Sequence, residues 1–66
     1  MLVPGFVLRT DHHLQVAMHN QVHVEVWQLG QLLDYGGPIE KFSESSVWIS
    51  GVHIAYLRVV CEFKVR

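Results

Sequence analysis

Five histidines and one cysteine carry most of the metal-binding chemistry in this sequence: His12, His13, His19, His23, His53 and Cys61. Structural zinc sites use four nitrogen or sulfur ligands, usually at short repeated spacings such as two ligands separated by two to five residues. His19 and His23 would share one face of a helix, but the alternation that starts at Val22 predicts a strand there. The sequence therefore predicts no metal and no other cofactor. The alternative role for these histidines is an assembly that responds to pH, because an unperturbed histidine titrates near pH 6.5.

A catalytic nucleophile is the second kind of chemistry to test against the sequence. Cys61 and His53 could form a nucleophile and its base, but no third residue is placed to orient them. The serines at 43, 45 and 46 lie in a polar turn and lack the Gly-x-Ser-x-Gly spacing of a nucleophile elbow. A chain of 66 residues also leaves little room for a pocket of about 300 Å³ or more. We therefore expect no enzymatic activity.

Aromatic and basic side chains form the one set that could build a binding surface: Trp27, Tyr35, Trp48, Tyr56, Arg58, Lys64 and Arg66. Aromatic rings on a sheet can stack on nucleic-acid bases, and basic residues can neutralise phosphates. The basic residues at 58, 64 and 66 fall on one face of the expected last strand, with Glu62 between them. However, the net charge is −1, without the basic excess typical of nucleic-acid binders. Nucleic-acid binding thus stays the alternative, and a protein-interaction surface is the first prediction.

The segment of residues 10–20 has two readings. Thr10 or Asp11 can cap a helix, because either side chain can accept hydrogen bonds from the free N–H groups of a first turn. A helical face would be formed by Leu14, Ala17 and Met18. A strand is the competing interpretation, because Val16 also alternates with apolar residues on both sides. Helix and strand remain open at this point.

The rest of the chain has the period-two pattern of strands. The expected strands cover residues 21–29, 39–42, 47–49, 52–56 and 57–65. Gly30 suggests a bulge or bend, the sequence DYGGP at 34–38 suggests a turn, and Ser50-Gly51 suggests a tight turn. The last run places Cys61 on the apolar face. The predicted fold is mainly β: a small five-stranded antiparallel β-barrel or half-barrel, with the N-terminal helix as an optional addition.

The sequence GPIEKFSESSVWI at 37–49 resembles the first signature of Sm-like proteins, a family of small barrels related in shape to SH3-like domains. The matching positions are Gly37, Ile39, Phe42, Val47 and Ile49. The resemblance implies a short helix before five strands, and it implies RNA binding by a ring of subunits. The family's acidic residue is replaced by Ser43 and its asparagine by Val47, and the Arg-Gly pair of the second signature is absent from the C-terminal run. The resemblance therefore implies the fold but not the RNA site.

Length and composition predict one domain over residues 1–66 that needs a partner. So short a chain buries only about 60% of its unfolded surface, and half of these residues are hydrophobic. A single cysteine permits no disulfide within the chain. We expect a homo-oligomer that also binds another protein: a non-enzymatic assembly module. No apolar run reaches about 18 residues and Pro4-Gly5 interrupts the start, so we expect no membrane partner and a cytoplasmic location.

Overall fold

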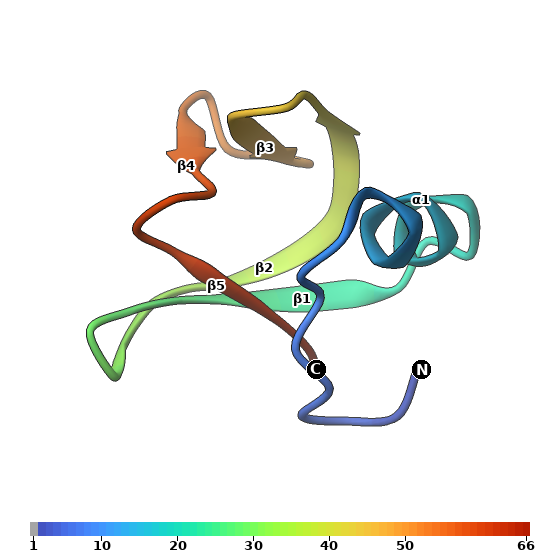
Figure 1. The fold of residues 1–66 in the computed structure, drawn as a ribbon, viewed down its shortest axis with the longest axis horizontal. Helices are drawn as coiled ribbons and strands as arrows, with labels where there is room; N and C mark the ends of the chain where they lie inside the picture. Colours follow the sequence, from blue (N-terminus) through green and yellow to red (C-terminus); the bar gives the residue numbers. More distant parts are fainter. Residues whose placement is uncertain (1) are drawn as a thin grey trace.

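The structure is a computed structural model that describes residues 2–66, and it contains one helix and one sheet (Figure 1). The elements in chain order are α1 (Asp11–His19), β1 (His23–Gln28), β2 (Gln31–Phe42), β3 (Ser46–Ile49), β4 (Ala55–Leu57) and β5 (Glu62–Val65). All five strands pair antiparallel in the order β4-β3-β2-β1-β5. The sheet curves without closing, because no pairing joins β4 to β5. The predicted half-barrel with a short N-terminal helix is confirmed.

Residues 11–19 form a helix whose start is held by a capping box. The Thr10 hydroxyl oxygen accepts from the His13 amide at 3.0 Å, and the His13 ring nitrogen Nδ1 accepts from the Thr10 amide at 3.4 Å. These two bonds satisfy donors that a helix otherwise leaves free. Leu14 and Ala17, one helical turn apart, are both buried against the sheet. The strand alternative for this segment is wrong, and Thr10 is the cap.

The β1–β2 hairpin turns at Leu29-Gly30, where both residues have positive φ, 51° and 74°. Two consecutive positive φ values are the signature of a type I′ hairpin turn. Gly30, where the sequence suggested a bulge or bend, is therefore the second residue of a hairpin turn. Asparagine or glycine normally occupies the first turn position, and a leucine there conceals the turn in the sequence.

The DYGGP sequence lies inside β2 and is not a turn between strands. Two residues of β2, Gly36 and Gly37, lie opposite the single residue Val24 of β1. This shift in the pairing register is that of a β-bulge. A Cβ added at Gly36 would lie 2.6 Å from Cγ2 of Ile49. The two glycines thus let β2 bend over the core, so one 12-residue strand takes part in both halves of the sheet.

The C-terminal run forms two strands with a turn between them. β4 spans three residues, and the carbonyl of Leu57 then accepts from the amides of Val60 and Cys61 at 3.4 and 3.1 Å. The prediction of one continuous strand over 57–65 is wrong, because these bonds turn the chain before β5 begins. Tertiary pairing of β5 with β1, from Val24↔Val65 to Trp27↔Glu62, decides where the last strand starts.

The two edges of the sheet differ. The outer edge of β5 is covered by residues 5–8: the amides of Gly5 and Leu8 donate to β5 carbonyls at 2.7 Å, and the Val65 amide donates to the Phe6 carbonyl at 2.9 Å. No strand within residues 2–66 pairs with the outer edge of β4. That edge therefore keeps free backbone groups.

The core lies on the concave side of the sheet, beneath α1 and the segment before it. Its buried side chains are Leu8, Leu14, Ala17, Val24, Val26, Ile39, Val47, Ile49, Phe63 and Val65. Every strand except β4 supplies at least one of them. Within residues 2–66 no helix has the length and apolar character needed to cross a membrane.

Candidate functional site

Four of the seven predicted interaction residues gather on the convex face of the sheet: Trp27, Tyr35, Lys64 and Arg66. Trp27 alternates with the buried Val26 on β1, and Lys64 lies between buried residues on β5, so both point away from the core. The Lys64 ammonium nitrogen lies 4.6 Å from the centre of the Trp27 ring. The Arg66 guanidinium carbon lies 3.8 Å from the centre of the Tyr35 ring. The structure thus joins these residues as two cation–π pairs.

Hydrogen bonds fix this convex face further. The Trp27 indole Nε1–H donates to a Glu25 carboxylate oxygen at 2.9 Å, and Arg66 donates to the Gly36 carbonyl at 3.3 Å. Among the described residues, neither Lys64 nor Arg66 has a carboxylate within ion-pair distance. Each of these cations therefore lies against the face of an aromatic ring rather than against a carboxylate. One face of each ring is already occupied, so a base stacking on that face would have to displace a cation.

Trp48 lies apart from this group, on the β2–β3 part of the sheet. It pairs across the strands with Lys41, whose ammonium nitrogen lies 4.7 Å from the centre of its ring. Lys41 was missed in the sequence reasoning. The available signal was that Lys41 and Trp48 are equally far from the polar turn at 43–46, so a regular hairpin register places them opposite each other.

Tyr56 points toward the core rather than outward. It pairs with the buried Val47 of the neighbouring strand β3, and its hydroxyl donates to Asp34 Oδ2 at 3.2 Å. Burial raises the pKa of Tyr56, and the nearby carboxylate of Asp34 raises it further. This bond links β4 to β2 across the concave side of the half-barrel. Tyr56 therefore lies apart from the four residues on the convex face.

Arg58 also has a structural place. It leaves the face shared by Lys64 and Arg66, because the chain turns directly after β4. Its guanidinium lies 2.7 Å from an Asp11 carboxylate oxygen and donates to the Ser43 carbonyl at 2.7 Å. A third contact reaches the Arg9 carbonyl at 3.4 Å. Arg58 therefore ties the helix start, the β2–β3 turn and the N-terminal segment together.

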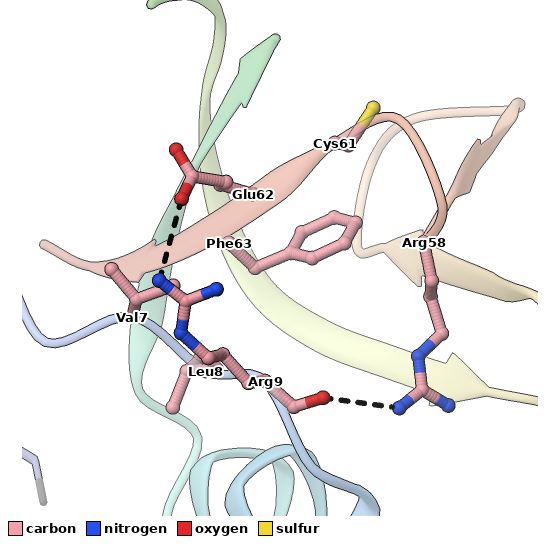
Figure 2. Close-up of a pocket in the computed structure, with 7 residues that line it drawn as sticks. All are labelled: Val7, Leu8, Arg9, Arg58, Cys61, Glu62 and Phe63. Carbon is pink, nitrogen blue, oxygen red and sulfur yellow. Dashed lines mark hydrogen bonds and ion pairs between the residues drawn. The ribbon is translucent and has the colours of Figure 1, made fainter.

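A small pocket of about 150 Å³ lies between the N-terminal segment and the start of β5 (Figure 2). Its lining residues are Val7, Leu8, Arg9, Arg58, Cys61, Glu62 and Phe63. Both arginines are already engaged, Arg9 with Glu62 at 3.8 Å and Arg58 as described above. Burial raises the pKa of the Cys61 thiol, which keeps it in the poorly nucleophilic protonated form. Within residues 2–66 no three His, Cys, Asp or Glu side chains come together as metal ligands would.

Two exposed apolar groups were missed in the sequence reasoning. The β4 patch consists of Ile54, Leu57, Val59 and Val60, and the leucine tip consists of Leu29, Leu32 and Leu33. A shallow groove of about 540 Å³ adjoins the β4 patch and is lined by Arg9, Glu44, Ser45, Leu57, Arg58 and Val59. Both groups sit at turns that the period-two pattern conceals. When a turn is not recognised, the alternating pattern predicts that an apolar residue beside it is a buried residue within a strand.

Comparison with known proteins adds no family to this geometry: no family model matches the chain, and no curated protein or solved structure matches it at a significant level. The resemblance of residues 37–49 to Sm-like and SH3-like barrels therefore stays a prediction.

Proposed function

We propose that this chain is a non-enzymatic assembly module that associates with a second copy of itself through the edge of β4. The observation that carries the proposal is an open strand edge with exposed apolar side chains beside it. Leu57, the last residue of β4, is 52% exposed, and Val59 in the turn that follows is 87% exposed. An unpaired edge next to apolar surface is a template for pairing with another chain.

The free backbone groups of β4 can be assigned from the β3–β4 pairing. The Arg58 amide donates to the Ser45 carbonyl, and hydrogen-bonded residues alternate along an antiparallel pair. Tyr56 therefore bonds toward β3, whereas the amides of Ala55 and Leu57 face the open edge. The Leu57 carbonyl is occupied by the turn, so the Ala55 amide and carbonyl and the Leu57 amide remain for a partner.

The covered edge of β5 favours a symmetric pair over a ring. A ring needs two different surfaces that fit each other, whereas a twofold dimer uses one surface twice. Residues 5–8 already occupy the β5 edge, which leaves β4 to pair with β4 of the second copy. In that arrangement the apolar side chains of the β4 patch pack against the same side chains of the second copy. The patch is small compared with the 1,200–2,000 Å² of a typical stable interface, so we expect a concentration-dependent dimer.

The test is sedimentation of the full chain over a dilution series. The wild type should shift from dimer to monomer on dilution. Leu57→Lys should be monomeric throughout, because it places a charge within the paired surface. Leu29→Asn is the matched control, since it changes an exposed leucine at the far end of the β1–β2 hairpin and should leave the dimer intact. A wild-type chain that is monomeric at every concentration, or a Leu57→Lys variant that dimerises normally, refutes the proposal.

Nucleic-acid binding is the second candidate, and the clustering of Trp27, Tyr35, Lys64 and Arg66 on one face favours it. Against it stand the net charge of −1 and the occupied ring faces. Binding of single-stranded RNA that weakens steeply with salt, and that is lost in Lys64→Gln, would support this candidate. Absence of binding at low salt would remove it.

A further inference from the structure

The leucine tip combines backbone strain with complete exposure of an apolar side chain. Leu29 has a φ of 51°, a conformation that residues with a Cβ adopt at a cost, and it is 97% exposed. The next residue is Gly30, so asparagine at 29 would give the Asn-Gly pair that this turn type prefers. Folding alone thus gives no reason for a leucine here. A strained and unfavourable residue at a protruding turn points to a role in binding.

The side chains behind the tip follow a graded order along the hairpin, which extends beyond the rest of the fold (Figure 1). The six residues from Gln28 to Leu33 carry no charge. Trp27 pairs with Leu32, the second cross-strand pair behind the turn, and Tyr35 pairs with Glu25, two pairs further back. Lys64 and Arg66 lie over these two rings, without a carboxylate partner among the described residues. The order is apolar, then aromatic, then cationic.

This order has the dimensions of a membrane interface. At about 3.3 Å per residue, Trp27 lies roughly 7 Å behind Leu29 and Glu25 roughly 13 Å behind it. Interfacial elements bury their apolar side about 5–10 Å into the boundary between headgroups and acyl chains. Tryptophan and tyrosine prefer the headgroup level, and cations beside them can meet lipid phosphates. Two carboxylates on the same strands already have partners: Glu25 accepts a hydrogen bond from the Trp27 indole, and Glu62 forms an ion pair with Arg9.

We propose that the β1–β2 hairpin docks on an anionic phospholipid surface, with the leucine tip entering the interface and Lys64 and Arg66 facing the phosphates. This surface is separate from the β4 edge and does not depend on dimer formation. The expectation of no membrane partner rested on the absence of a spanning segment, and docking at the interface requires none. The proposal revises that expectation.

The test is co-sedimentation of the full chain with vesicles of phosphatidylcholine containing phosphatidylglycerol, and with vesicles of phosphatidylcholine alone. The wild type should bind the anionic vesicles. Leu29→Asn should reduce the partition coefficient roughly tenfold, the effect of losing one buried leucine side chain. The same variant should unfold at an equal or higher temperature, because Asn-Gly suits the turn. A loss of binding therefore cannot be assigned to misfolding.

Two further variants sharpen the result. Leu57→Asn makes the same substitution at another exposed leucine, in the β4 patch, and should bind vesicles as the wild type does. In a Trp48→Phe background, emission comes from Trp27 alone and should shift to shorter wavelength when anionic vesicles are added. The proposal is overturned if the wild type does not sediment with anionic vesicles, if Leu29→Asn binds equally well, or if Leu57→Asn loses binding to the same extent.

Discussion

Gly36→Ala is the substitution for which the structure gives the most direct expectation. The added Cβ would lie 2.6 Å from Cγ2 of Ile49, a separation that carbon atoms do not tolerate. Ile49 is fully buried, so its side chain cannot swing into solvent to relieve the contact. Either Ile49 leaves its rotamer or β2 straightens at its bend. Both responses disturb the contact between the two halves of the sheet.

The expected loss is a large fraction of the total stability. Overpacking of a core by one methyl group costs about 1–3 kcal/mol. A domain of 66 residues has a free energy of unfolding of roughly 3–10 kcal/mol at the usual 0.05–0.15 kcal/mol per residue. Gly36→Ala should therefore lower the urea midpoint markedly and leave the slope of the transition unchanged.

The adjacent Gly37 supplies a matched control. It lies in the same strand, and the nearest atom to an added Cβ is the Ser50 carbonyl oxygen at 3.7 Å, an ordinary contact. Gly37→Ala should change the free energy of unfolding by much less. Ile49→Ala removes the clashing methyl group, so the double variant with Gly36→Ala should lose less stability than the sum of the two single variants. Equal effects at the two glycines, or additive losses in the double variant, would refute the steric explanation.

Two further predictions concern the helix cap and the concave side of the sheet. Thr10→Ala should lower the free energy of unfolding by about 1 kcal/mol, because the His13 amide loses its acceptor, and denaturation with urea will measure it. For Tyr56, the pKa is raised in the folded state by burial and by Asp34, so its stabilising contribution is complete below the ordinary phenol pKa of about 10 and is lost as pH rises above it. Tyr56→Phe should therefore show a smaller loss of stability between about pH 9.5 and 11 than the wild type.

Controls for both predictions come from exposed positions. Gln15→Ala lies on the exposed side of α1 and should leave the urea midpoint within about 0.5 kcal/mol of the wild type. Tyr35→Phe tests whether replacing any tyrosine changes the loss of stability at alkaline pH. A Thr10→Ala variant as stable as the wild type would contradict the cap assignment, and parallel pH profiles for Tyr56→Phe and the wild type would contradict the assignment at Tyr56.

The sequence alone determined the features that depend on near neighbours. Period-two runs predicted a five-stranded, mainly β fold. The cap at Thr10 and the spacing of Leu14 and Ala17 allowed the helix, and the Ser50-Gly51 turn was read correctly. Trp27, Lys64 and Arg66 were placed on polar faces by simple alternation, and all three lie on the convex face. These features follow from local periodicity and capping, which a sequence carries directly.

Only the tertiary structure decided where the strands end and which side chains meet. The glycines of DYGGP read as a turn, but contact of Gly36 with Ile49 makes them a bend within one strand. The Leu57 carbonyl binds the amides of a turn that the alternating pattern of 57–65 conceals, and Arg58 thereby leaves the convex face. Tyr56 points inward because β4 pairs with β3 at Val47. Such choices depend on contacts between residues far apart in the chain, and a period-two pattern is equally compatible with a strand that continues and one that turns.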